Sequence, residues 1–364
     1  MEMLIIHCVI GVEGGVFSVV KNLIYEQKKA GMKTALIYIF GSINEKDDHL
    51  VGTEIIRFKK KNLLMLTGMD VYQEYHKLEK KYPNTKLILH MHNPVTVGLF
   101  NSIYDLPFIC TLHGINSGNY ISKLLTSFIL KKMKKLKKTI IGVSNQTSNY
   151  YNKIIRESDY IKTIHNGTYI KKGDNYLNKQ RNERFSIGYV SYLDSFKGWN
   201  YLVEAYGLLP NKLRGQVKLH LIGNISEKEK KKLEIVLHQY EMDEVEYYGP
   251  VFSASTHVTP YLDVLVLPSQ WEGIPMCILE SMGNGVPVLA TKVGGIPEIL
   301  INGVNGFFIK RNAKDIASKL LELIENKSMY QCLAKNSREV FLQGFTSEIM
   351  AYNYYQYYKT MSRG

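Results

Sequence analysis

The sequence predicts an α/β fold with two parallel sheets. Short apolar runs alternate with longer amphipathic segments, as expected for strands that are linked by crossover helices. This alternation occurs twice, before and after a polar stretch at residues 166–184 that is rich in Asn, Lys and Gly. The chain has 364 residues, which is about two domains at ~150 residues each. We therefore expect two domains, with the linker at 166–184.

In the first half, the strand pattern begins at residues 3–10, and a helical pattern follows at 16–29. Further apolar runs of strand length are found at 34–40, 86–90, 108–113 and 139–143. In the second half, strands are predicted at 185–190, 217–222, 245–248, 264–267 and 287–290. The tyrosines of the stretch AYNYYQYYKT near the end predict a helix that packs on a neighbouring surface.

The charge lies mainly in the first half. The net charge is +13; residues 1–165 hold 23 basic and 13 acidic residues, a net +10, which leaves +3 for the remainder. This field favours an anionic partner such as a phosphate compound or an anionic membrane surface. Nucleic acid would use the same charge, but the basic residues are not interleaved with aromatic ones, so we expect no nucleic-acid partner.

The cysteines and the apolar runs bear on the compartment. Cys8, Cys110, Cys277 and Cys332 are widely spaced, which predicts neither a zinc site nor a disulfide framework. No apolar stretch reaches ~18 residues, and the N-terminus lacks the basic region of a signal peptide. We expect a cytoplasmic protein, and the basic half leaves peripheral attachment to the inner face of the plasma membrane open.

Glycines mark the junction between the first strand and the first helix. Gly11, Gly14 and Gly15 lie there, where a helix N-terminus offers N–H groups to an anion. The spacing is not GxGxxG, so it does not support a nicotinamide cofactor. A purely structural turn is an equal alternative.

The strongest motif follows the strand predicted at 264–267. Glu272 precedes a helix whose start is marked by Pro275, and Glu280 lies within that helix. The N–H groups around Gly273 to Met276 are suited to a diphosphate. Carboxylates accept paired hydrogen bonds from sugar hydroxyls, so the two acids are suited to different hydroxyls of one extended ligand.

This segment, EGIPMCILESMGNGVPVLATKVGGIPEIL, resembles retaining glycosyltransferases of family 4, which have the GT-B fold. Weaker resemblances occur in the family's order at Gly14-Gly15 and at residues 111–114, 166–167 and 194–199. The resemblance implies two Rossmann-like, doubly wound domains that face a central cleft. Their expected bounds are 1–165 for the acceptor-binding domain and 166–345 for the nucleotide-sugar-binding domain, with 346–364 as a helix that packs back on the first.

The resemblance also implies roles for single residues. Glu280 would bond the ribose, Glu272 would contact the donor sugar, and Lys197 would neutralise the diphosphate leaving group. His113 would touch the donor sugar near the reacting carbon, and no protein nucleophile, general base, metal or other cofactor is expected. Other nucleotide-sugar contacts are expected from Gly14, Gly15, Ser191, Tyr192, Gly273, Ile274, Pro275 and Met276.

The sequence departs from the family at the phosphate site. The family commonly has Gly-Arg where this chain has Ser191-Tyr192, and Tyr supplies no permanent cation. Lys197 with helix amides would then suffice, or another basic residue would substitute, or activity would be low.

His90 and His92 lie two residues apart at a strand end, as in a metal pair, but the sequence offers no evident third ligand. We therefore expect no metal and assign His92, with Asn93, to the acceptor side.

A lysine-rich helix is predicted at residues 123–138. Leu125, Ile129, Met133 and Leu136 form an apolar stripe that is expected to face the core. The lysines between them are suited to an anionic membrane; they are Lys131, Lys132, Lys134, Lys135, Lys137 and Lys138.

The resulting hypothesis is a retaining transferase that moves a hexose or N-acetylhexosamine from a nucleoside diphosphate sugar, with UDP favoured. The acceptor would be a glycan, lipid-linked as in bacterial surface polysaccharide synthesis. Two alternatives remain: a sugar-nucleotide epimerase of the same fold, and a catalytically degenerate relative that binds nucleotide or glycan.

Overall fold

The computed structural model consists of two compact units. Unit 1 contains residues 1–167 together with 347–364, and unit 2 contains residues 168–346. The structure describes residues 2–43, 47–58, 64–92, 101–115, 118–170, 184–240, 242, 245–251 and 257–361. Most of the predicted linker, residues 171–183, lies outside the described residues.

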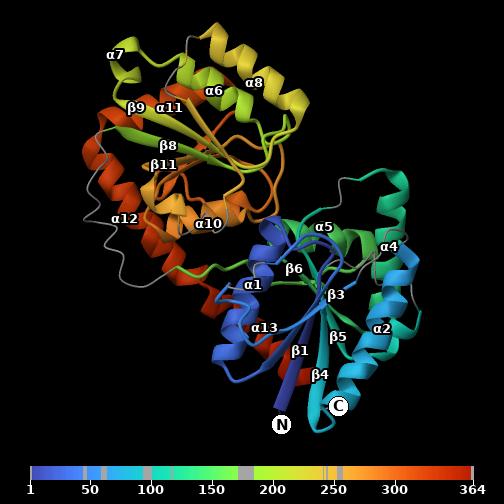
Figure 1. Ribbon diagram of the computed structural model, residues 1–364. Coiled ribbons are helices and arrows are strands. Elements are labelled where there is room, and N and C mark those ends of the chain that lie inside the picture. Colours follow the sequence, from blue (N-terminus) through green and yellow to red (C-terminus); the bar gives the residue numbers. More distant parts are fainter. Residues whose placement is uncertain are drawn as a thin grey trace. The chain divides into compact units, whose positions relative to one another are not determined.

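Unit 1 is built on a seven-stranded parallel sheet with the order β3-β2-β1-β4-β5-β6-β7. Its strands are β1 (Glu2–Cys8), β2 (Lys33–Tyr38), β3 (Glu54–Arg57), β4 (Thr85–Met91), β5 (Phe108–Leu112), β6 (Thr139–Gly142) and β7 (Lys162–Thr163). Its helices are α1 (Gly14–Lys29), α2 (Leu64–Lys81), the short 3₁₀ helix η1 (Asn101–Asp105), α4 (Tyr120–Lys135), α5 (Asn145–Ile155) and α13 (Ser347–Met361). Figure 1 shows α1 and α13 on one side of this sheet and α2 and α4 on the other.

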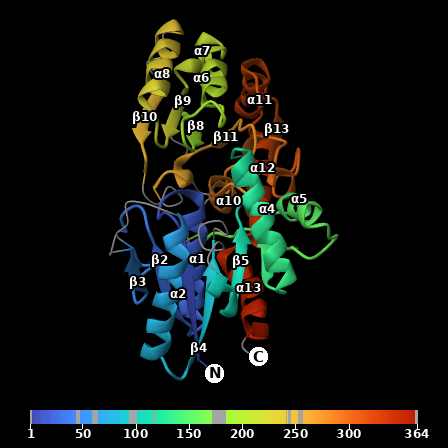
Figure 2. The ribbon, with the colours of Figure 1, turned by 90° about the vertical axis from the view of Figure 1, so that its right-hand side faces the viewer.

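Both faces of this sheet are buried, as expected for parallel strands. Leu4 and Ile6 of β1 pack in the core on the side of α2, α4 and α5, whereas Leu36 of β2 packs against α1 on the opposite face. Figure 2 shows α2 and α4 in front of the strands of unit 1. The strict alternation of side chains along each strand therefore decides which residues face α1 and α13.

The last helix, α13, packs against α1 within unit 1. Tyr354 and Tyr358 are buried, whereas Tyr352 on the other face of the helix is 65% exposed. Ser347 donates a hydrogen bond from its hydroxyl to Glu26 of α1 at 2.8 Å. The tyrosine-rich run therefore divides into one buried face and one solvent face.

Unit 2 has a six-stranded parallel sheet with the order β10-β9-β8-β11-β12-β13. Its strands are β8 (Phe185–Val190), β9 (Val217–Ile222), β10 (Val245–Gly249), β11 (Val264–Leu267), β12 (Val288–Thr291) and β13 (Gly306–Ile309). Its helices are α6 (Trp199–Gly207), α7 (Asn211–Arg214), α8 (Glu227–Gln239), α10 (Met276–Gly283), α11 (Ala313–Glu325) and α12 (Lys327–Gly344), with short 3₁₀ helices at Thr259–Tyr261 (η3) and Ile296–Glu298 (η4). In chain order its strands run 3-2-1-4-5-6, the doubly wound arrangement of Rossmann-like domains.

The topology indicates where ligands bind. In such sheets, ligands bind at the carboxyl ends of the strands, where the strand order reverses. These points lie between β1 and β4 in unit 1 and between β8 and β11 in unit 2. The loops after β8 and β11 contain the sequence-predicted Lys197 and Glu272.

Candidate functional site

The loop that follows β8 holds Lys197 just before α6. The Lys197 N–H donates to the Asp194 carboxylate at 2.8 Å, which closes a tight turn. Gly198 follows with a φ of +77°, and a Cβ atom there would lie 2.3 Å from the Pro268 carbonyl oxygen. Only glycine therefore allows the loop after β8 to approach the loop after β11 this closely.

Lys197 and Glu272, which are far apart in sequence, form an ion pair. The Lys197 Nζ lies 2.7 Å from Glu272 Oε1, and their side chains are 27% and 9% exposed. The Ser269 hydroxyl donates to the same oxygen at 2.7 Å. The pair places a cation and the carboxylate that was predicted to contact the donor sugar side by side at the end of the sheet.

The helix α10 begins beside this pair. Pro275 is its N-cap residue rather than a residue of its first turn, and no side chain caps the helix. The first amides of a helix have no acceptor within it, so the helix end attracts an anion. Gly294, with a φ of +58°, packs its backbone against the Glu272 carbonyl, and the Gly295 N–H donates to the Gly273 carbonyl at 2.8 Å. These backbone contacts fix the loop that carries Glu272.

Glu280 lies within α10 and is 9% exposed. The pKa of the Cys277 thiol is raised mainly by burial and further by the negative charges of Glu272 and Glu280, and the charge of Lys197 lowers it. The structure therefore brings the two predicted carboxylates into one electrostatic environment, together with Lys197.

Sequence reasoning missed Arg311, which lies before α11. Its Nε donates to the Pro268 carbonyl at 3.0 Å, and its Nη2 donates to the Ser195 carbonyl at 2.7 Å. Arg311 thereby ties the loop after β8 to the loop after β11. Because its partners are backbone carbonyls, no residue pattern could have revealed this role.

Ser191 and Tyr192 lie directly after β8, where the family resemblance leads us to expect Gly-Arg. The Tyr192 side chain is 49% exposed, and its carbonyl accepts a hydrogen bond from the Tyr189 hydroxyl at 2.7 Å. The position therefore presents a phenol rather than a cation.

In unit 1, the helix α1 begins at Gly14, two residues before the predicted start at residue 16. Gly14 and Gly15 therefore belong to its first turn rather than to the loop before it. Gly14 has a φ of +73°, and the N-cap residue Glu13 makes no side-chain cap. The predicted contact of Gly14 and Gly15 with the donor phosphates stays a prediction.

Histidines gather at the carboxyl ends of β1, β4 and β5. His7, His90 and His92 bring ring nitrogens within 4.8 Å of one another, so His7 supplies the third neighbour that the sequence did not reveal. His92 also lies 3.0 Å from His113 through their ring nitrogens. His92 is buried, and its two ring nitrogens face His7 and His113, whereas its assignment to the acceptor side stays a prediction. Asn93 lies outside the described residues.

The lysines of α4, which ends at Lys135, and of the turn that follows it are not equivalent. Lys134 pairs with Glu157 and donates to the Ile155 carbonyl, and Lys138 donates to the Leu106 carbonyl at 3.0 Å. Lys132 donates to Asn101, so these three lysines are bound to unit 1 itself. Lys131, Lys135 and Lys137 are exposed. The predicted core stripe is wrong at its end, because Leu136 is 44% exposed.

The chain is similar to known glycosyltransferases in sequence and in fold. Residues 174–340 match the family described as glycosyl transferases group 1. The chain is 27% identical over 69% of its length, and 69% of the relative's, to an uncharacterized glycosyltransferase of Methanocaldococcus jannaschii. It is 24% identical to the capsular polysaccharide biosynthesis glycosyltransferase CapM of Staphylococcus aureus, over 62% of this chain and 56% of CapM.

The crystal structure of Anabaena HepE in complex with UDP and glucose is similar over 99% of this chain and 100% of HepE, with 19% identity and a TM-score of 0.79. At this identity the likeness shows the fold, and it confirms the predicted α/β class with two Rossmann-like domains of the GT-B type. The assignment to family 4 stays a prediction. Since residues 174–340 match the group 1 model and the relatives are named for the same activity, the chain is similar to glycosyltransferases of group 1.

Proposed function

We propose that the protein transfers a hexose or N-acetylhexosamine from a UDP-sugar, with retention of configuration, to a glycan acceptor of a bacterial surface polysaccharide. The observation that carries this proposal is the Lys197–Glu272 pair beside the N-terminus of α10, with Glu280 in the same helix. HepE was crystallised with UDP and glucose, and CapM is named for capsular polysaccharide synthesis, which supports the donor and the product class.

The chemistry requires stabilisation of the departing diphosphate. Lys197 and the first amides of α10 supply positive charge and hydrogen-bond donors to the charge that develops on the leaving phosphate. Glu272 holds the Lys197 ammonium through its 2.7 Å contact and offers its carboxylate to sugar hydroxyls. Glu280 accepts hydrogen bonds from the ribose. No side chain is assigned as a nucleophile, since the leaving phosphate accepts the acceptor's proton on the same face.

Tyr192 offers an exposed phenol and no cation to the phosphates. A protein that only binds nucleotide is therefore the second candidate function. Such a protein would bind nucleotide without turnover, and an epimerase would consume a sugar nucleotide without any acceptor. Incubation with a UDP-sugar, with and without a glycan acceptor, separates the three: transfer requires the acceptor, epimerisation does not, and a binding protein consumes nothing.

The first test is nucleotide binding. We expect UDP to raise the melting temperature of the wild type, because a ligand at 100 times its Kd stabilises the native state by about 2.7 kcal/mol. Glu280→Ala should lose this shift, whereas Glu322→Ala should keep it, because Glu322 pairs with Lys319 on the exposed face of α11. The measurement is thermal unfolding with UDP, GDP, ADP and CMP. A folded wild type that no nucleoside diphosphate stabilises would contradict the donor site.

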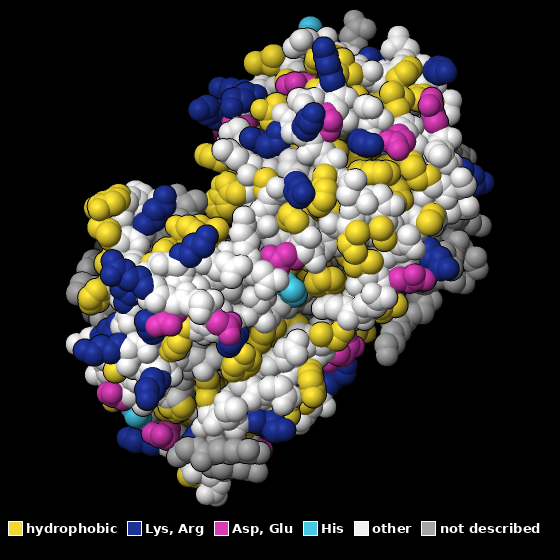
Figure 3. Space-filling view, turned by 180° about the vertical axis from the view of Figure 1, so that it is seen from behind, with side chains coloured by type: hydrophobic (Ala, Val, Ile, Leu, Met, Phe, Trp, Pro, Cys, Tyr) yellow, Lys and Arg dark blue, Asp and Glu magenta, His cyan; other side chains and the backbone are white. Residues whose placement is uncertain are grey.

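We further propose that α4 binds a membrane surface and that the acceptor is a lipid-linked glycan in this membrane. On α4, four large apolar side chains form an outer face opposite to its buried residues Ile129 and Met133. They are Tyr120, Ile121, Leu124 and Phe128, with exposed fractions of 75%, 66%, 51% and 63%. Figure 3 shows hydrophobic and basic side chains next to one another on unit 1.

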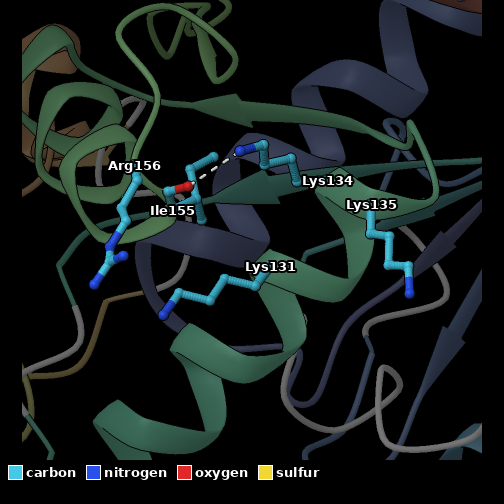
Figure 4. A pocket seen from close by; sticks show the side chains of 5 residues that line it. All are labelled: Lys131, Lys134, Lys135, Ile155 and Arg156. Atoms are coloured by element: carbon cyan, nitrogen blue, oxygen red, sulfur yellow. Dashed lines mark hydrogen bonds between the residues drawn. The ribbon is translucent and has the colours of Figure 1, made fainter.

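The basic half of α4 continues this face. A surface pocket of about 580 Å³ is lined by Lys131, Lys134, Lys135, Ile155 and Arg156. Figure 4 shows Lys131 and Arg156 directed to the same side, while Lys134 bonds the Ile155 carbonyl. Apolar side chains beside cations are typical of helices that lie in the interface of anionic membranes. Among the described residues, no helix has the length and apolar character needed to cross a bilayer.

Vesicle sedimentation tests this surface. We expect the full chain to bind vesicles that contain phosphatidylglycerol, more weakly at 0.5 M salt, and not to bind phosphatidylcholine alone. Replacing Leu124 and Phe128 with Ser should weaken binding at least tenfold, since each buried side chain contributes about 1.5–3 kcal/mol. Ile235→Ser is the matched control, because Ile235 is 66% exposed on α8 of unit 2. Equal binding by both variants would contradict the assignment to α4.

A further inference from the structure

A buried polar network lies between the sheet of unit 1 and the helices α1 and α13. His7 of β1 and His90 of β4 are register partners, and both alternate with residues that pack on the opposite face. The same alternation puts Thr111 of β5 on the side of α1 and α13. His92 and His113 continue β4 and β5 by one position past the strand ends.

The histidines form a hydrogen-bonded chain. Gln27 Oε1 of α1 lies 2.8 Å from His7 Nε2, and His7 Nδ1 lies 3.0 Å from His92 Nε2. His92 Nδ1 in turn lies 3.0 Å from His113 Nε2. Burial lowers the pKa of His7 and of His113 to about 4 and holds the pKa of His92 well below its usual range, so each ring carries one N–H at neutral pH.

The amide of Gln27 sets the direction of every bond in this chain. An amide oxygen only accepts, so the hydrogen of His7 must be on Nε2. His7 Nδ1 therefore accepts from His92 Nε2–H, and His92 Nδ1 accepts from His113 Nε2–H. His113 is left with its Nδ1 as an unprotonated acceptor.

The last helix holds this amide in place. Gln27 Nε2 donates to the Tyr358 hydroxyl at 3.2 Å, and that hydroxyl lies 2.8 Å from His90 Nδ1. His90 Nε2 lies 2.8 Å from the Thr111 hydroxyl, which also bonds Tyr354 at 2.9 Å. Because the Tyr358 hydroxyl accepts from Gln27, its own hydrogen is donated to His90 Nδ1. The hydrogen of His90 is then on Nε2, which donates to the Thr111 hydroxyl. The one orientation of Gln27, with its oxygen on His7 and its nitrogen on Tyr358, therefore sets the direction of both branches.

A metal ion is the other chemistry that three clustered histidines suggest. In this cluster, all six ring nitrogens of His7, His90 and His92 already face a protein hydrogen-bonding group at 3.0 Å or less. These partners are an amide, two hydroxyls and imidazoles, so no carboxylate is present among them to orient the ligands. The network accounts for the cluster without an ion.

We propose that Gln27, His7 and His92 are positioning residues that hold His113 as the neutral Nε2–H tautomer, so that its Nδ1 accepts a hydrogen bond from a hydroxyl of the sugar substrate. The sugar contact of His113 rests on the proposed function, whereas the tautomer does not. This arrangement makes His113 selective for a hydroxyl over a group that cannot donate, such as fluorine.

Imidazole ¹⁵N spectra of the full-length protein test the tautomer without substrate. We expect His113 and His92 to show a protonated Nε2 and an unprotonated Nδ1, with resonances assigned from single His→Gln variants. His92→Gln should preserve this state, because its amide donates to His7 and accepts from His113; His92→Phe and Gln27→Leu should lose it. His76→Gln on the exposed surface of α2 is the control. A protonated Nδ1 on His113, or ¹⁵N shifts of metal-bound rings, would overturn the proposal.

Kinetics test the consequence. We expect His92→Phe to raise the KM for the donor about tenfold, the effect of one lost hydrogen bond, and His92→Gln to restore it. Replacing the bonded hydroxyl of the donor with fluorine should raise the KM of the wild type, because His113 then loses its hydrogen bond. The same replacement should leave the KM of the His92→Phe variant unchanged. If the tautomer is lost in His92→Phe but KM is unchanged, the substrate part of the proposal is overturned. The increase in melting temperature with UDP tests the proposed donor site of unit 2 in a separate experiment.

Discussion

Replacement of Lys197 by Met is expected to lower kcat by about 10²–10³-fold, the usual effect of removing one group that stabilises developing charge. The substitution keeps an unbranched side chain as far as the ε carbon, with sulfur in place of the δ methylene, and removes the ammonium. It leaves the Glu272 carboxylate, whose side chain is 9% exposed, with a hydroxyl partner in place of a cation. The measurement is the initial rate of UDP release from a UDP-sugar in the presence of a glycan acceptor.

The chain offers a matched control for this experiment. Lys232 pairs with Glu229 at 2.6 Å on α8, also within unit 2, and the side chains are 47% and 11% exposed. Lys232→Met removes an ion pair of similar geometry within α8 that contains neither Lys197 nor Glu272, so it should leave kcat within about twofold. Equal losses in both variants would mean that the effect of Lys197 is on stability rather than on the leaving group.

Acid is expected to destabilise unit 1 before unit 2. Burial lowers the pKa of His7 and His113 to about 4 and holds those of His90 and His92 well below their usual range. Between about pH 6.5 and 4 the unfolded chain therefore binds protons that the folded chain does not. Each such histidine lowers the free energy of unfolding by up to about 1.4 kcal/mol per pH unit, and above about pH 7 the effect vanishes.

Hydrogen exchange and fluorescence separate the two units. Peptides from β1, β4 and β5 should lose protection between pH 6.5 and 5 after correction for the intrinsic exchange rate at each pH. Both tryptophans, Trp199 and Trp271, belong to unit 2, so their fluorescence reports that unit in the same samples. His76→Gln should change neither signal. Simultaneous loss of both signals at every pH would contradict an origin in the histidine network.

Much of the fold was predictable because buried parallel strands are short, continuous apolar runs. The strands β8, β9 and β11 have the predicted bounds, whereas β3, β7 and β13 were missed. The missed strands have two or four residues, and β3 and β7 lie at the edges of their sheet, where fewer apolar residues are needed. The helix α4 shows another limit: one apolar stripe was assigned to the core, and the second, outer stripe was overlooked.

Candidate site residues could be named from the sequence where a short segment resembles the family, as for Lys197 after β8 and Glu272 after β11. Glu272, Gly273 and Glu280 follow one strand, so spacing and resemblance together identified them. Arg311 bonds carbonyls of two loops, and Gln27 lies in an ordinary amphipathic helix. Their roles arise from tertiary contacts that leave no local pattern.

The placement of α13 has a consequence for biosynthesis. Residues 347–361 complete unit 1, yet the ribosome adds them after every residue of unit 2. Until then, nascent unit 1 lacks the tyrosines that bond Gln27, His90 and Thr111, and this side of its sheet is incompletely covered. Unit 2 has its whole sequence available first. The order of folding during translation is therefore expected to be the reverse of the order of the two units along the chain.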